Sequence, residues 1–101
     1  MAINVSIVED NRGTREKLAE LLNRAPNLRC LNSYNSGEAA LVGIPAENPD
    51  VALVDINLPG MNGIELVTKL KLAAPKLQIL ILTSYGESRL IFDALRAGAS
   101  G

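Results

Sequence analysis

The chain has 101 residues, of which 48% are hydrophobic and 21% charged, and its formal net charge is −1. These values are typical of one globular domain with a single core rather than of a disordered chain. The near-neutral charge and the aromatic content of only 3% argue against direct binding of nucleic acid. With no histidine and one cysteine, the chain cannot build a Ser-His-Asp triad, a histidine zinc site or an internal disulfide.

The N-terminal residues predict a cytoplasmic protein. Residues 1–4 lack the basic region of a signal peptide, and charges or prolines interrupt every apolar stretch before it reaches the length of a membrane span. Cys30 lies in an apolar segment and is expected to be a small buried side chain rather than a reactive thiol. We therefore expect no contact with a membrane.

The first half of the chain predicts two strand–helix units. The run 3–8 is rich in Val and Ile and predicts a buried strand, and the helix that follows is expected to end at Pro26. A weaker strand at 28–31 leads to a second helix, which is expected to begin after Ser36 and to stop at Pro45. The buried stripe of the first helix is predicted from residues at helical spacing, namely Leu18, Leu21, Leu22 and Ala25.

The second half predicts two further units of the same kind. The strand 51–54 precedes a helix that begins at Asn62 in a pattern resembling a capping box and ends at Pro75. The strand 77–82 precedes a last helix that stops at Gly98. With right-handed crossovers, this βαβαβαβα order predicts an α/β fold with a parallel sheet and helices on both faces.

Side chains that can bind metal or phosphate follow three of the four predicted strands. Glu9 and Asp10 follow the first strand, Asp55 ends the third, and Thr83 follows the fourth. Ligands of open α/β sheets bind at the carboxyl ends of the strands, so these side chains should meet in one pocket. Each also has an ordinary structural role as a helix cap, turn former or loop residue, but their occurrence together favours a phosphoacceptor pocket.

Four segments in this order resemble the receiver domain of bacterial response regulators, and most of all its NarL/FixJ-type group. They are the acidic pair 9–10, the segment Val-Asp-Ile-Asn-Leu-Pro-Gly-Met-Asn-Gly at 54–63, Leu-Thr-Ser at 82–84 and Arg-Ala-Gly-Ala-Ser-Gly at 96–101. The resemblance implies a flavodoxin-like (CheY-like) doubly wound sheet with strand order 2-1-3-4. Residues 1–101 would then be a single receiver domain that is truncated before the family's fifth strand and helix, and that normally controls a DNA-binding output domain.

The resemblance also implies a role for each site residue. Asp55 would accept a phosphoryl group from a sensor histidine kinase or an acyl phosphate, and Thr83 would contact that group and switch rotamer. Glu9, Asp10, Asp55 and the backbone carbonyl of Asn57 would hold Mg²⁺ or Mn²⁺, in keeping with the oxygen ligands that these cations prefer. The chain would catalyse no reaction other than its own phosphorylation.

Two other functions remain open. The family's phosphoryl-binding lysine has no counterpart, because Lys69, Lys71 and Lys76 are predicted on or just after the third helix, so the chain could be an inactive interaction module. A haloacid-dehalogenase-like phosphotransferase would need an acid two residues after the nucleophile, where this chain has Asn57.

Without the family's fifth strand, the strand 77–82 would be an unpaired apolar edge. We therefore expect the chain to self-associate.

Overall fold

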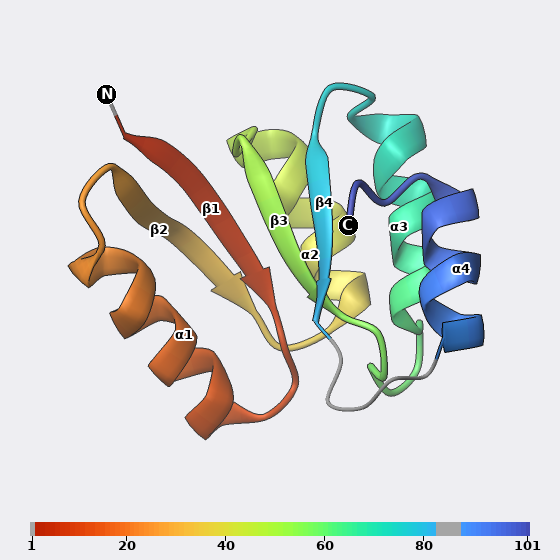
Figure 1. The fold of residues 1–101 in the computed structure, drawn as a ribbon, viewed down its shortest axis with the longest axis horizontal. Helices are drawn as coiled ribbons and strands as arrows, with labels where there is room; N and C mark the ends of the chain where they lie inside the picture. Colours follow the sequence, from red (N-terminus) through yellow and green to blue (C-terminus); the bar gives the residue numbers. More distant parts are fainter. Residues whose placement is uncertain (1, 83–87) are drawn as a thin grey trace.

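The structure, a computed structural model, describes residues 2–82 and 88–101 and confirms the predicted parallel α/β fold (Figure 1). Four parallel strands form one sheet in the order β2-β1-β3-β4. No helix within the described residues is both long and apolar enough to cross a bilayer. The elements in chain order are β1 (Ile3–Val8), α1 (Arg12–Arg24), β2 (Leu28–Tyr34), α2 (Gly37–Glu47), β3 (Val51–Asp55), α3 (Gly63–Ala73), β4 (Gln78–Leu82) and α4 (Ser88–Ala97).

The main core lies on the sheet face that packs against α2, α3 and α4. Side chains alternate along β3, so Ala52 and Val54 are buried on this face while Val51 and Leu53 point to the other one and are only half-buried. Helix side chains complete the core, because the apolar stripe of each helix faces the sheet. The fully buried ones with the largest volumes are Ile44, Leu66, Leu70 and Val67.

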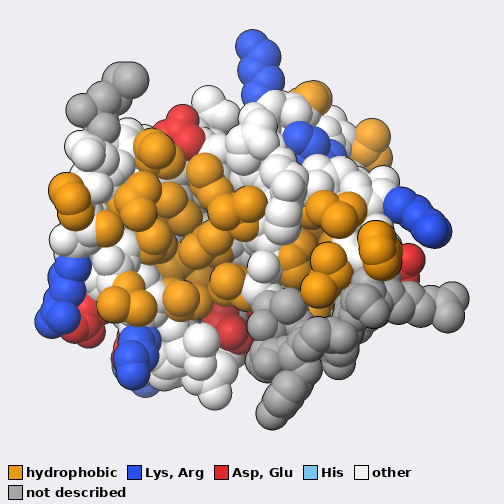
Figure 2. Space-filling view, viewed as in Figure 1, with side chains coloured by type: hydrophobic (Ala, Val, Ile, Leu, Met, Phe, Trp, Pro, Cys, Tyr) orange, Lys and Arg blue, Asp and Glu red, His pale blue; other side chains and the backbone are white. Residues whose placement is uncertain are grey.

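Of the helices that the structure describes, α1 alone covers the opposite face, and it lies over β1 and β2 (Figure 1). The strand registers place Ile7, Leu53 and Leu80 side by side on this face, but only Ile7 is fully buried and Leu80 is 40% exposed. Figure 2, seen from this side, shows apolar side chains gathered over the middle of the sheet. We call this surface, made of Val51, Leu53, Leu80 and Leu82, the open face.

The half-covered sheet explains why one part of the predicted α1 stripe is wrong. No residue of α1 is fully buried, and Leu21 is 55% exposed although it has the spacing of a core residue. A helix that packs alone on one side of a sheet has no neighbouring helix to bury the outer edge of its stripe. Leu18 and Leu22 are half-buried, as expected for the residues that face the sheet directly.

Two predicted boundaries differ from the structure. Strand β2 continues to Tyr34, beyond the apolar run, because its polar residues still pair with β1. Helix α2 passes through Pro45 and ends at Glu47, with Asn48 in the left-handed conformation as its C-cap (φ 54°). A proline removes one helical hydrogen bond, but so close to the end the helix still closes through the bond from Asn48 N–H to the Ile44 carbonyl.

The outer edge of β4 is not the unpaired edge that the sequence predicts. Ser100 N–H donates to the Ile79 carbonyl at 2.8 Å, and Ile81 N–H donates to the Gly101 carbonyl at 2.7 Å. The chain returns to this edge after α4 because Gly98 adopts a positive φ of 121°, which favours glycine. The backbone groups of β4 that face outwards are therefore partly satisfied within the chain.

The buried hydroxyl of Ser6 generates a prediction about stability. Ser6 is completely buried on the main core side, and its Oγ has no hydrogen-bond partner among the described residues. An unsatisfied buried hydroxyl costs about 1–3 kcal/mol, so Ser6→Ala should raise the free energy of unfolding in urea by about 1 kcal/mol. Ser33→Ala on the edge strand is the control and should change it by less than about 0.5 kcal/mol. A less stable Ser6→Ala variant would show that the hydroxyl is satisfied in solution.

Candidate functional site

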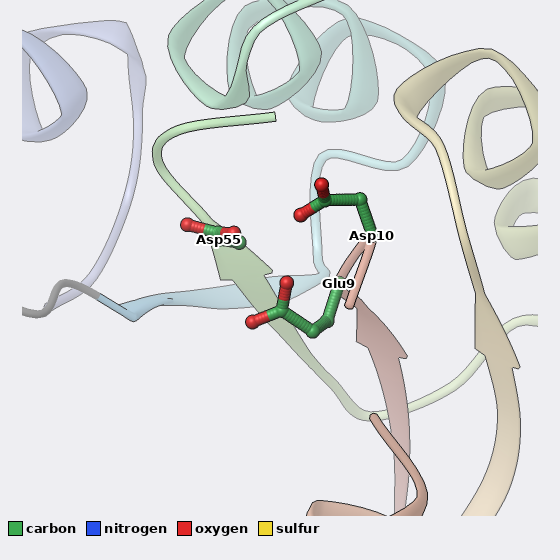
Figure 3. A group of neighbouring side chains, drawn as sticks. All are labelled: Glu9, Asp10 and Asp55. Carbon is green, nitrogen blue, oxygen red and sulfur yellow. The ribbon is translucent and has the colours of Figure 1, made fainter. Parts of the chain in front are cut away.

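Three carboxylates meet at the carboxyl end of the sheet, as the sequence predicts. Val8 of β1 is paired with Val54 of β3, so Glu9 and Asp55 occupy the next positions on neighbouring strands, and Asp10 follows in the loop. One carboxylate oxygen from each of the three acids lies within 4.8 Å of the others. Figure 3 shows the three side chains arranged around a shared space, and we call this group the acidic pocket.

Glu9 is the most buried member of the acidic pocket, with only 8% of its surface exposed. Its backbone N–H donates to the Tyr34 carbonyl at 3.0 Å, and its Oε2 accepts a bond from Asn11 N–H at 3.1 Å. Desolvation by burial, together with the neighbouring carboxyls of Asp10 and Asp55, raises the pKa of Glu9 to about 7, although the bond from Asn11 opposes the shift. The metal-free pocket therefore favours a proton or a cation at this position.

Asp55 is half-buried and is held by the loop that follows it. Asn57 N–H donates to its Oδ1 at 3.0 Å, which fixes the carboxylate beside the pocket. The start of α3 presses against the same segment, because a Cβ on Gly63 would lie 2.5 Å from the Asp55 carbonyl oxygen and 2.7 Å from Ile56 Cα. Only glycine allows this close approach, so Gly63 helps to set the position of Asp55.

Helix α3 begins as the capping pattern predicts. The Asn62 side chain accepts a hydrogen bond from Glu65 N–H at 2.9 Å, and the helix ends at Ala73, two residues before Pro75. A defined N-cap fixes the first turn of α3, and this turn is the part that touches the Asp55 segment. The capping pattern therefore contributes to the geometry of the acidic pocket.

Arg15 is a site residue that the sequence analysis missed. Its guanidinium Nη1 donates to the carbonyl of Glu9 at 2.9 Å and lies 3.4 Å from the carbonyl of Asp10. Asn11 accepts from Thr14 N–H as the N-cap of α1, which places Arg15 one turn into the helix, beside the loop. The available signal was a basic residue four positions after a helix cap that itself follows an acidic pair.

The remaining predicted residues differ in what the structure says of them. Thr83 lies outside the described residues, so its role stays a prediction. Asn57 is exposed and contributes the backbone bond to Asp55, while the role of its carbonyl as a ligand stays a prediction. Cys30 is half-buried rather than buried, and desolvation raises the pKa of its thiol, in agreement with an unreactive side chain.

The lysines of α3 lie away from the acidic pocket, as the sequence predicts. Lys71 Nζ donates to the carbonyls of Pro75 and Leu77, both at 2.8 Å, which places it at the opposite end of the sheet from Asp55. Lys69 Nζ lies 3.2 Å from a carboxylate oxygen of Glu65 on the helix surface. Both ammonium groups thus have partners outside the acidic pocket in this arrangement.

The donor set of the acidic pocket fits a hard divalent cation. Its three potential ligands are carboxylates from Glu9, Asp10 and Asp55, and carboxylate oxygens suit Mg²⁺, Mn²⁺ or Ca²⁺. A cation would also relieve the mutual repulsion that accompanies the raised pKa of Glu9. Three carboxylates suffice for Mg²⁺, which usually keeps several of its waters.

The raised pKa of Glu9 predicts how the stability of the metal-free protein depends on pH. Between the ordinary value of 4.5 and about 7, the folded state binds more protons than the unfolded state, so the free energy of unfolding should fall as pH rises through this window. The chain has no histidine, whose titration would overlap with that of Glu9. Urea unfolding with a chelator from pH 4.5 to 8 should show this fall, and Glu9→Gln should flatten it. A wild-type profile already flat without metal would contradict the assignment.

Comparisons with known proteins agree with this geometry. The family described as "Response regulator receiver domain" matches residues 5–101. The chain is 41% identical over 99 residues to the DNA-binding transcriptional activator DevR/DosR of Mycobacterium tuberculosis, covering 98% of this chain and 46% of that protein. It therefore spans about half the length of this relative.

Solved structures show the same likeness. A LuxR-family two-component response regulator from Aurantimonas sp. SI85-9A1 superposes with a TM-score of 0.94 at 28% identity, covering 100% of this chain and 72% of that one. The receiver domain of the putative response regulator NarL from Mycobacterium tuberculosis gives a TM-score of 0.90 at 28% identity, and the match covers 97% of this chain and 79% of that one. The family match, the strand order and the acidic pocket lead to one conclusion: the chain belongs to the receiver domain family of response regulators and is of the NarL/FixJ type.

Proposed function

We propose that this receiver domain accepts a phosphoryl group on Asp55 from a sensor histidine kinase or a small acyl phosphate. The observation that carries the proposal is the convergence of three carboxylates from the ends of two neighbouring strands. A carboxylate oxygen of Asp55 attacks the phosphorus, the bond from phosphorus to the donor's nitrogen or acyl oxygen breaks, and the donor leaves with that electron pair. The product is an aspartyl phosphate.

In this proposal the acidic pocket would also hold a divalent cation. Glu9, Asp10 and Asp55, with the carbonyl of Asn57, would hold Mg²⁺ or Mn²⁺, and the cation would supply positive charge that offsets the repulsion between phosphate and carboxylates. The bond from Asn57 N–H to Oδ1 keeps the Asp55 carboxylate from rotating, so one oxygen stays available. Thr83 would contact the transferred group.

The proposed output of phosphorylation is control of transcription. The relative DevR/DosR is described as a DNA-binding transcriptional activator, and the chain spans 46% of it. In a longer protein of this kind, the receiver would regulate an attached DNA-binding domain without touching nucleic acid itself. The chain's net charge of −1 agrees with such a division of roles.

The phosphoacceptor role predicts a single modification site. Incubation with acetyl phosphate and Mg²⁺ should add the mass of one phosphoryl group to the intact protein, because Asp55 is the acid that the following loop holds in position. Asp55→Asn should abolish the addition. Asp50→Asn, at the other end of β3, is the matched control and should be modified like the wild type. Modification of Asp55→Asn would exclude Asp55 as the acceptor.

A binding module without phosphoryl chemistry is the second candidate. The location of Lys69 and Lys71 away from the acidic pocket favours it, since within residues 2–82 and 88–101 no lysine is bonded there. The mass measurement separates the two functions, because the module would remain unmodified although it binds Mg²⁺. A dehalogenase-like phosphotransferase is disfavoured by Asn57, which cannot act as a general acid.

We also propose that the chain self-associates through the open face. Leu53 and Leu80 lie together there with no helix over β3 and β4 among the described elements, and apolar patches of this kind favour association. The average molecular mass measured by sedimentation should therefore rise as the protein concentration increases through the micromolar range. Leu80→Lys should suppress the rise. Leu72→Lys should not, because Leu72 lies outside the open face, on α3, where it is 79% exposed. A wild type that stays monomeric throughout would refute this proposal.

A further inference from the structure

The short connection between β1 and α1 must hold two acidic side chains against their mutual repulsion. Glu9 and Asp10 are consecutive residues, and both carboxylates approach Asp55 on the neighbouring strand. Two like charges at this separation favour a backbone rearrangement that separates them. The loop therefore needs backbone contacts that oppose such a rearrangement.

Among the described residues, three residues supply the bonds that hold this loop, namely Tyr34, Asn11 and Arg15. On one side, Glu9 N–H donates to the Tyr34 carbonyl of β2. At the far end, Asn11 N–H donates to the Glu9 carboxylate, and the Asn11 side chain caps α1. Within residues 2–82 and 88–101, the carbonyls of Glu9 and Asp10 are bound only by Arg15, whose guanidinium lies 2.9 Å and 3.4 Å from them.

The contact from Arg15 fixes the orientation of two successive peptide groups. Each carbonyl accepts from the guanidinium on α1. The side chains of Glu9 and Asp10 extend from this backbone into the acidic pocket (Figure 3). Arg15 is half-buried, so the bond is partly shielded from water, and bonds from a charged donor are stronger than neutral ones. Arg12, one turn earlier, instead pairs with Glu16 in an ion pair in which both side chains are mostly exposed.

We propose that Arg15 is a positioning residue for the acidic pocket: its guanidinium holds the Glu9 and Asp10 carbonyls so that their carboxylates are arranged for a divalent cation. The inference rests on the proposed function, since it concerns the same cation. It makes a distinctive prediction about whether loss of Arg15 raises or lowers the affinity for the cation. Removing a positive charge near a cation site strengthens cation binding by Coulomb's law, whereas losing the backbone support weakens it.

The test is a Mg²⁺ titration of the full chain, followed by amide NMR. Arg15→Met keeps much of the apolar stem but loses the donors, and it should weaken Mg²⁺ binding by about tenfold, at the lower end of what loss of a ligand's supporting bond produces. Arg15→Lys retains a charged donor and should restore the affinity to within about threefold of wild type. Arg12→Met removes the same charge from the same helix and should leave the affinity unchanged or slightly higher.

Each outcome decides the matter. Unchanged or tighter Mg²⁺ binding in Arg15→Met, with wild-type binding intact, overturns the positioning role and leaves the proposed function standing. Absence of Mg²⁺ binding in the wild type overturns the proposed function and this inference with it. If Arg15→Met does not fold, as shown by its amide spectrum, Arg15→Lys decides: binding weakened as much as tenfold despite a folded spectrum overturns the role of the charged donor.

Discussion

The parallel pairing of β1 with β3 is the contact on which the rest of this molecule depends. Its register places Ile7 beside Leu53 and Val8 beside Val54, so it decides which side chains enter the core and which face α1. The same register brings Glu9 and Asp55 together at the next position. Because side chains alternate along a strand, a slip by one residue would move the apolar set to the wrong face and separate the acids. Core packing therefore stabilises the acidic pocket indirectly.

The strand positions and the site could be predicted because both depend on local sequence. Runs of Val, Ile and Leu that end in an acid indicate a buried parallel strand with a ligand-binding end, and this pattern located Glu9, Asp10 and Asp55. The capping pattern at Asn62 is equally local, since an Asn side chain and a backbone N–H three residues later suffice to form the cap.

The features that could not be predicted depend on distant parts of the chain. Leu21 has the spacing of a core residue, but its burial depends on what else covers the sheet. The polar end of β2 extends because β1 offers hydrogen bonds, and α2 continues through Pro45 because the terminal turn still closes. Arg15 was missed because its spacing after a helix cap is only a weak signal, and its bonds to backbone carbonyls depend on how the loop folds.

The single-sided attachment of α1 has a consequence for local stability. Its residues are at most half-buried, whereas α2, α3 and the strands supply all of the largest fully buried side chains. Local unfolding begins where few apolar contacts must be broken, so α1 is the helix expected to open at the lowest free energy. Asn11 and Arg15 open with it, and the loop of Glu9 and Asp10 then loses its supports. Ligand binding in the acidic pocket and closure of α1 are thus linked equilibria. Binding favours the closed helix, and whatever favours the closed helix strengthens binding by the same free energy.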